Sequence, residues 1–184
     1  MRIEIVKNII AVNKKRLPNN FPNLEKVGVR IGGGAHGSVY RYGRGRVIKF
    51  GIKWASDENF KKLKAFVKKT KRHKAIVNVY NCGRFNKRFY WLEMEHLSKE
   101  LTSIEENIYL PRFEGYMSRY WYNKPRWAYN PRYDFNQFPK KWKTLLRSMI
   151  TIKERHIDLH PGNIMRNTKG EPKMIDIESF VWSY

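Results

Sequence analysis

Three side chains with oxygen donors recur at short intervals in the last third of the chain. Asp158 precedes Asn163 by five residues within His156-Ile-Asp-Leu-His-Pro-Gly-Asn163, and Asp176 follows Asn163 by thirteen residues. The Pro-Gly pair favours a tight loop between Asp158 and Asn163. Carboxylate and amide oxygens bind Mg²⁺ in proteins, and a carboxylate can also accept the proton of an attacking hydroxyl. These residue types at this spacing predict a Mg²⁺-dependent phosphoryl-transfer site.

Each of the three side chains fits one role in moving the γ-phosphoryl group of ATP, a reaction that depends mainly on positioning and charge neutralisation. Asp158 would accept the proton of the acceptor hydroxyl, while Asn163 and Asp176 would hold Mg²⁺. The alternative interpretation is a polar surface turn in which the same residues are ordinary caps.

The stretch from His156 to Asn163, followed by Asp176, resembles the catalytic loop and metal-binding segment of the protein-kinase-like superfamily. Its His-Pro-Gly-Asn ending is close to the aminoglycoside and choline kinase branch and to atypical kinases. The resemblance implies that His156 braces the loop and that His160 acts beside the γ-phosphate. Where the family usually has Asp-Phe-Gly, this chain has Asp-Ile-Glu, so Glu178 is an additional candidate metal ligand.

A glycine-rich stretch near the start of the chain is the second motif with chemical meaning. It reads Gly32-Gly-Gly-Ala-His-Gly-Ser-Val39 and fits Gly-x-Gly-x-x-Gly-x-Val. Strand-like alternation on both sides predicts a hairpin tip over phosphates, whereas a dinucleotide-binding fold would place a helix after the glycines. A hairpin that is merely flexible is the alternative. The candidate nucleotide-binding residues are Gly32, Gly33, Gly34, Ala35, His36, Gly37 and Val39.

The next element, Arg46-Val-Ile-Lys-Phe50, resembles the third strand of the kinase N-terminal lobe with its phosphate-binding lysine. Because side chains alternate along a strand, Val47 and Lys49 share a face. Lys49 would bind the α- and β-phosphates while Val47 covers the adenine. The family also has a glutamate that orients this lysine, for which Glu58 is the candidate and Asp57 the alternative.

Further elements are predicted from periodicity. A helix over residues 57–67 would bury Phe60, Leu63 and Val67, and a helix over 140–153 would lead into the catalytic loop. Strands are predicted over 25–31, 38–42, 46–50, 75–80, 88–94 and 163–165. By resemblance, the hinge and the adenine pocket would be formed by Met94, Glu95, Leu97 and Met165.

Residues 98–139 match no kinase pattern and combine aromatic with basic side chains. Aromatic faces among guanidinium groups can stack on bases and pair with phosphates, but the same composition can also pack a core with its charges outward. Both interpretations stay open for Tyr109, Phe113, Tyr116, Tyr120, Trp121, Tyr122, Trp127, Tyr129, Tyr133, Phe135 and Phe138, with Arg112, Arg119, Lys124, Arg126 and Arg132 between them.

The expected fold class is α+β, and the resemblance implies the two-lobed kinase-like architecture. An N-terminal amphipathic helix and a connector would occupy residues 1–24, and an antiparallel sheet with one main helix would occupy 25–97. Residues 98–184 would form a mostly helical second lobe. Only eight residues follow Asp176, so the resemblance implies that this lobe is reduced.

The composition bounds the partners of the chain. The formal charge of +22 over 184 residues predicts attraction to polyanions such as nucleic acid or acidic proteins, although heavy use of lysine can also reflect base composition of the genome. The single cysteine, Cys82, excludes an intramolecular disulfide, and no apolar run is long enough to span a bilayer. We therefore expect an intracellular, cytoplasmic chain. By the resemblance it would use ATP and Mg²⁺ and transfer the γ-phosphate to a protein serine or threonine hydroxyl. The alternatives are a kinase with a small-molecule acceptor, and a non-catalytic kinase-fold module that binds nucleic acid or protein.

Overall fold

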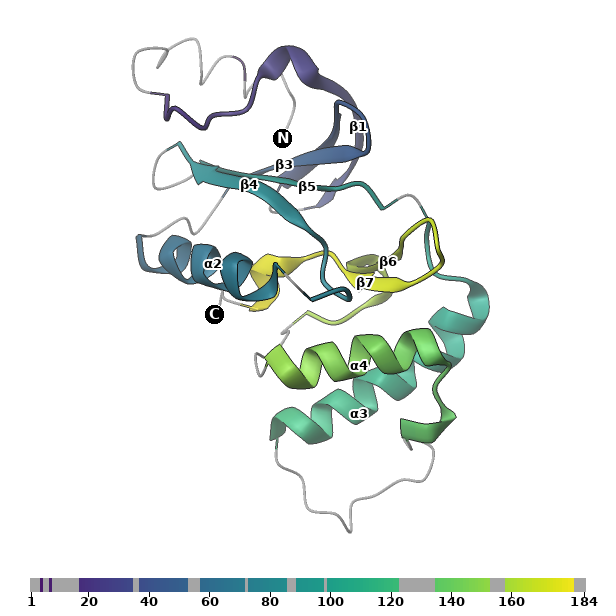
Figure 1. Cartoon of the computed structure of the whole chain (residues 1–184). Coiled ribbons are helices and arrows are strands. Elements are labelled where there is room, and N and C mark those ends of the chain that lie inside the picture. The colour runs from purple at the N-terminus through teal and green to yellow at the C-terminus, as the bar shows by residue number, and fades with distance from the viewer. Residues whose placement is uncertain are drawn as a thin grey trace. The chain divides into compact units, whose positions relative to one another are not determined.

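The structure is a computed structural model, in which the chain forms two compact units (Figure 1). The first unit comprises residues 1–68 and 78–96, and the second comprises 69–77 and 97–184. The residues described are Glu4, Lys7, 17–34, 37–52, 57–71, 73–85, 89–97, 99–122, 135–152 and 158–180.

A five-stranded antiparallel sheet organises the first unit, with strand order β1-β2-β3-β5-β4 (Figure 1). Sequential strands lie side by side except where β5 enters between β3 and β4. The fold is therefore α+β, as expected from the sequence. The strands are β1 (Val27–Gly34), β2 (Gly37–Tyr42), β3 (Arg46–Ile52), β4 (Val79–Arg84) and β5 (Phe89–Glu95).

One face of this sheet carries an aromatic core that the N-terminal segment covers. Phe21 packs edge-on against Trp91 with ring centroids 4.8 Å apart, and the short helix η2 (Leu24–Lys26) follows it. Residues 17–24, which were expected to be a connector, are therefore part of this unit. Of the expected helix at the start of the chain, only Glu4 and Lys7 are described, and both are helical. The core consists of Tyr40, Tyr42, Ile48, Phe50 and Trp91, with Leu17, Phe21, Leu24, Val27 and Phe85 packed against it.

Helix α2 (Asp57–Thr70) lies on the other side of the sheet from residues 17–26 (Figure 1). The predicted helix was therefore found, but it extends three residues further than expected. Its buried residues include Phe66, while Val67 is only half-buried, so the expected apolar side was wrong by one position. Arg84 of β4 links the helix to the sheet by pairing with Asp57 and lying 5.6 Å from the Phe60 ring.

Aromatic packing between two helices dominates the second unit. A π-helical turn, η3 (Glu105–Tyr109), continues into α3 (Leu110–Tyr122), and α4 (Lys140–Ile152) packs against it. The rings of Phe113 and Trp142 meet edge to face at 5.9 Å. Among the described members of the aromatic and basic segment, packing thus accounts for Tyr109, Phe113, Tyr116, Phe135 and Phe138, which contact one another or α4, or are buried. Residues 123–134 lie outside the described part of the chain.

A two-stranded antiparallel sheet carries the candidate catalytic segments. The strand expected over residues 75–80 was misplaced, because β4 begins at Val79 and Ile76 forms a parallel bridge with Met174 instead. Val77 donates a hydrogen bond to the Met174 carbonyl over 2.9 Å, so Ala75 to Val77 belong to the second unit. The remaining elements are η6 (Phe135–Gln137), η7 (Pro161–Asn163), β6 (Ile164–Arg166), β7 (Pro172–Met174) and η8 (Ile177–Phe180).

None of the helices in the described ranges combines the length and apolarity that crossing a bilayer requires.

Candidate functional site

The loop before β6 is shaped by a histidine cap. His160 has an extended backbone, and its carbonyl accepts the Asn163 backbone N–H over 2.9 Å, which closes the turn η7. The His160 ring also caps this turn, since Nδ1 accepts the Gly162 N–H over 3.1 Å. Pro161 fits the first position of the turn because it needs no N–H there. The Pro-Gly pair therefore makes the tight loop that the sequence predicted.

Asn163 ties the end of this loop back to its beginning. Its side-chain Nδ2 donates to the Asp158 backbone oxygen over 2.7 Å and lies 3.4 Å from Asp158 Oδ2. Asn163 is buried, whereas Asp158 is exposed. The amide nitrogen is thus occupied within the loop, and Asn163 Oδ1 accepts no hydrogen bond from any residue in the described ranges. That oxygen is the atom with which Asn163 could bind a cation.

Asp176 is brought next to Asn163 by the β6–β7 pair. Ile164 pairs with Met174 in the register of the two strands, and the Ile175 N–H donates to the Asn163 carbonyl over 3.0 Å. Asp176 follows Ile175 directly and is therefore the residue next to this hydrogen bond. Its Oδ2 accepts the Ser179 hydroxyl over 2.5 Å, and its carbonyl accepts the Ser179 N–H over 3.3 Å. Two partners from Ser179 thus fix the position of Asp176.

The oxygen ligands offered by Asn163 and Asp176 fit Mg²⁺ better than they fit a metal whose ligands all come from the protein. Within the ranges that the structure describes, no three His, Cys, Asp or Glu side chains are grouped as in a closed metal centre. Mg²⁺ usually takes one or two protein ligands and completes its shell with waters and substrate phosphates. Asn163 and Asp176 supply two oxygen-bearing side chains on adjoining backbone segments. Glu178, the additional candidate, lies buried in η8.

His160 also faces Asp158. Because His160 Nδ1 accepts the Gly162 N–H, the neutral ring carries its proton on Nε2. Nε2 lies 3.6 Å from Asp158 Oδ2, which is near the candidate base but too far for a hydrogen bond. A third group acts on this corner from α3. Burial raises the pKa of the Glu114 carboxyl, and the positive charge of the His160 ring in its protonated form opposes that rise.

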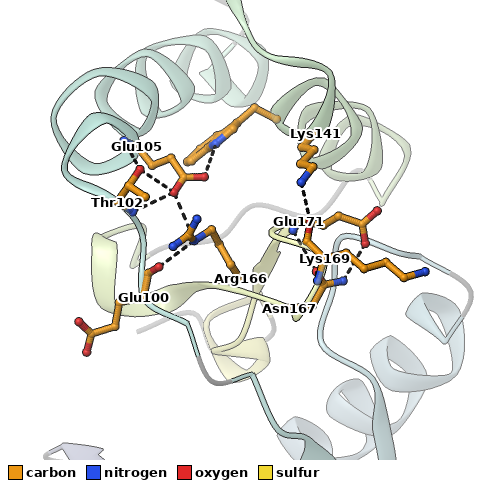
Figure 2. Close-up of polar contacts among 9 residues, drawn as sticks. Glu100, Thr102, Glu105, Lys141, Arg166, Asn167, Lys169 and Glu171 are labelled. Carbon is orange, nitrogen blue, oxygen red and sulfur yellow. Dashed lines mark hydrogen bonds and ion pairs between the residues drawn. The ribbon is translucent and has the colours of Figure 1, made fainter.

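A polar cluster around Glu105 joins the helices of the second unit to β6 (Figure 2). Glu105 Oε2 accepts the Thr102 N–H over 2.8 Å and the Thr102 hydroxyl over 2.9 Å, while Oε1 accepts Trp142 Nε1 over 3.3 Å. Arg166 Nε lies 3.4 Å from Glu105 Oε2 and donates to the Glu100 carbonyl over 2.8 Å. Arg166 ends the strand that begins directly after Asn163, so the cluster anchors that strand.

In the first unit, the glycines of the hairpin are required for different physical reasons. Gly33 has φ of +144°, which other residues rarely adopt, and a Cβ at Gly37 would lie 2.6 Å from the Phe50 carbonyl oxygen. A Cβ at Gly32 would meet nothing within 4 Å. Strands β1 and β2 stay paired up to Gly34 and Gly37. Geometry alone therefore requires glycine at positions 33 and 37 but leaves position 32 unexplained.

Lys49 lies on β3, the third strand, in register with Val39 of the glycine hairpin. Directly opposed residues of an antiparallel pair share a face, and Val47 lies two residues away on that same face. Glu58 is exposed on α2 and pairs with Lys62 over 2.8 Å, which lowers the pKa of its carboxyl. Its role in orienting Lys49 stays a prediction.

The expected hinge residues differ in what their backbones can still bind. Met94 is buried near the end of β5, and the Glu95 N–H donates to the Asn78 carbonyl over 2.9 Å. The Glu95 carboxylate accepts the Asn78 side-chain amide over 3.0 Å. Leu97 is buried, and within the described ranges its N–H makes no hydrogen bond. Met165 is half-buried on β6.

No protein-family model matches the chain, and no curated protein matches it either. The assignment of a function therefore depends on the geometry above.

Three further residues of the predicted motifs, Ala35, His36 and His156, lie outside the described residues. The structure adds Ser179, Glu105 and Glu114, which sequence reasoning missed. Thr102-Ser-Ile-Glu105 is a capping-box pattern, so Glu105 could have been found as a helix cap. Ser179 follows Asp176 by three residues, a spacing typical of local hydroxyl–carboxylate bonds. Glu114 has no local signal.

Proposed function

We propose that the chain is an ATP- and Mg²⁺-dependent phosphotransferase of the protein-kinase-like superfamily. Its acceptor in this proposal is a protein serine or threonine hydroxyl. Asp158 is the base, Asn163 and Asp176 hold Mg²⁺, and His160 adjoins the transferred phosphoryl group. Lys49 and the backbone of the glycine hairpin bind the phosphates, and Val39, Val47, Met94 and Met165 enclose the adenine, with Glu95 and Leu97 at its edge.

One observation carries the proposal: a single loop and the neighbouring strand end gather Asp158, Asn163 and Asp176 at one place. The Asn163 side-chain amide donates to the backbone oxygen of Asp158. The Asn163 backbone carbonyl accepts the N–H of Ile175, the residue before Asp176. Two oxygen ligands for Mg²⁺ beside an exposed carboxylate are the parts that phosphoryl transfer requires.

The first unit supports the proposal independently. In protein kinases a glycine-rich loop covers the phosphates and the phosphate-binding lysine is on the third strand. Here the glycine hairpin joins the first two strands, and Lys49 lies on the third strand in register with Val39. A helix, α2, follows that strand in the chain. This order of elements supports the proposal.

The proposed reaction balances as a single displacement. The acceptor oxygen bonds to the γ-phosphorus while the bond from phosphorus to the bridging oxygen breaks, and ADP leaves with that electron pair. The hydroxyl proton passes to the Asp158 carboxylate. Bound Mg²⁺ would neutralise charge on the phosphates. His160 Nε2 lies 3.6 Å from Asp158 Oδ2, so the two side chains adjoin without a hydrogen bond between them.

The test is transfer of labelled γ-phosphate from ATP in the presence of Mg²⁺. The purified chain would be offered its own hydroxyls, the proteins of a cell lysate and a metabolite extract. We expect protein-bound label, and we expect Asp158→Asn to reduce it by about 10² to 10⁴-fold. Glu106→Gln is the matched control, because Glu106 is an exposed carboxylate of the same unit.

The outcomes separate the alternatives. Phosphorylated metabolites without labelled protein would replace the protein acceptor with a small molecule, as the resemblance of the catalytic loop to aminoglycoside and choline kinases suggests. Undiminished labelling by Asp158→Asn protein would exclude Asp158 as the base. ATP binding without transfer to either class of acceptor would mean a non-catalytic binding module.

A further inference from the structure

Helix α2 presents a row of lysines that the sheet and the proposed active site leave unused. From Asp57 to Lys71 the chain has six lysines and two carboxylates. Both carboxylates are already paired, Asp57 with Arg84 and Glu58 with Lys62. The remaining positive charge of this helix is therefore not neutralised by its own acidic residues.

Three of the lysines fall on one strip of the helix. With 3.6 residues per turn, Lys61, Lys64 and Lys68 follow the i, i+3, i+7 spacing and point to the same side. All three are exposed. Within the described ranges, Lys61 and Lys68 have no hydrogen-bond or ion-pair partner, and the Lys64 ammonium lies 5.0 Å from the Phe60 ring centroid. We call Lys61, Lys64 and Lys68 the α2 basic strip.

Like charges three and four residues apart destabilise an isolated helix. The three lysines of the α2 basic strip repel one another in this way, whereas Lys62 on the same helix is neutralised by a carboxylate partner. An external anion with regularly repeating charge would remove the repulsion at all three positions of the strip. The phosphate backbone of a nucleic acid is such an anion, with one charge about every 3.4 Å along each strand.

An anionic membrane fits the helix less well. Helices that lie in a membrane surface insert an apolar side between the lipids. The apolar side of α2 is already buried within the protein, since Phe60, Leu63 and Phe66 are at most 8% exposed. Only the charged side of α2 is available to a partner. Binding through charge alone, without insertion, is the way in which proteins hold nucleic-acid backbones.

We propose that the α2 basic strip binds the phosphate backbone of a nucleic-acid duplex without reading its sequence. The α2 basic strip shares no residue with the set assigned to phosphoryl transfer, and its function does not depend on that assignment. Binding should fall steeply with salt, because each phosphate neutralised by a lysine releases counterions. Asp158→Asn protein should bind the duplex as the natural chain does.

The experiment measures binding of short labelled duplexes of DNA and RNA to the full chain at several salt concentrations. The variant is K61Q/K64Q/K68Q, and the matched control is K26Q/K99Q/K140Q, which removes the same charge at exposed lysines elsewhere. We expect the α2 variant to bind about tenfold or more weakly and to lower the salt slope by about 2 to 3. We expect the control to change binding by less than the α2 variant does.

Circular dichroism and thermal melting of both triple variants establish that α2 still folds. Equal weakening by the two variants would overturn the proposal, because total charge would then explain binding. Unchanged affinity of the α2 variant would overturn it as well. Vesicles with anionic lipid form the last arm, and loss of vesicle binding with intact duplex binding would assign the strip to a membrane. Tighter binding of the DNA or of the RNA duplex would show which kind of duplex the α2 basic strip prefers.

Discussion

The Asn163 amide nitrogen lies 2.7 Å from the Asp158 backbone oxygen and 3.4 Å from its carboxylate. The candidate metal ligand therefore holds the candidate base through one side chain, and the two cannot move independently. Asn163 contributes its nitrogen to the loop and leaves its oxygen for a cation. An aspartate at this position would keep an oxygen ligand but lose the donor.

We expect Asn163→Asp to lower both stability and transfer. The new carboxylate would face the Asp158 carbonyl and carboxylate at close range. It has no N–H, so the hydrogen bond from residue 163 to the Asp158 carbonyl would be lost. The expected loss is about 1–3 kcal/mol in the free energy of unfolding, measured by urea denaturation. Asn107→Asp is the control, since Asn107 is exposed and should change stability by no more than about 0.5 kcal/mol. Equal losses for the two variants would contradict the role of the Asn163 amide.

Ser179 should tune the affinity for Mg²⁺. Its hydroxyl donates to Asp176 Oδ2 over 2.5 Å and so fixes one oxygen of a candidate ligand. Removing such a support typically costs about 10 to 100-fold in metal affinity or activity. We therefore expect Ser179→Ala to raise the Mg²⁺ concentration for half-maximal transfer, while Ser179→Thr, which keeps the hydroxyl, stays close to the natural chain. A lower rate at saturating Mg²⁺ with unchanged half-saturation would argue against this role.

Glu105 should contribute to stability more than other glutamates of the second unit. Its carboxylate accepts hydrogen bonds from Thr102 and Trp142 and lies against Arg166, with side-chain exposures of 12% for Glu105 and 23% for Arg166 (Figure 2). Hydrogen bonds to charged groups are worth about 1.5–3 kcal/mol each in this setting, so Glu105→Gln should lower the unfolding free energy by at least about 1.5 kcal/mol. Glu106→Gln, one residue along and exposed, should change it by less than about 0.5 kcal/mol.

Local patterns in the sequence were sufficient to predict the tight turn between Asp158 and Asn163 and the glycine hairpin. Pro161-Gly162 determines the turn at η7, and the alternation around the glycines gives the β1–β2 pair. The signal in both places comes from neighbours in the chain, and the backbone follows their preferences directly.

Long-range pairing was not predictable from the same patterns. Residues 75–77 are apolar enough for a strand of the large sheet, yet Ile76 pairs with Met174, almost a hundred positions away. Alternation indicates a strand but not its partner. The helix α3 was not predicted, for a related reason. Its aromatic side, represented by Phe113, packs against α4, and that partner is not visible in the segment's own pattern. Glu114 likewise approaches His160 only through the packing of α3.

Glu114 should make stability depend on pH. Burial raises the pKa of this carboxyl in the folded chain, so the folded state retains the proton to higher pH than the unfolded state, where glutamate titrates at about 4.3. Between the two pKa values the folded state binds more protons, and its stability falls as pH rises. Glu114→Gln cannot ionise and escapes this loss. Unfolding measured in urea from pH 4 to 7 should therefore show the variant gaining on the natural chain as pH increases.

His160→Ala tests the interaction between His160 and Glu114 from the side of the histidine. The charge of His160 favours the ionised form of Glu114, so its removal should raise the pKa of Glu114 further. The pH range over which stability is lost should then extend to higher pH, and Glu114→Gln should abolish this change in the double variant. Glu106→Gln controls for the loss of one negative charge from a chain of net charge +22. If the difference between Glu114→Gln and the natural chain is constant across the pH range, Glu114 does not titrate differently in the folded and unfolded states.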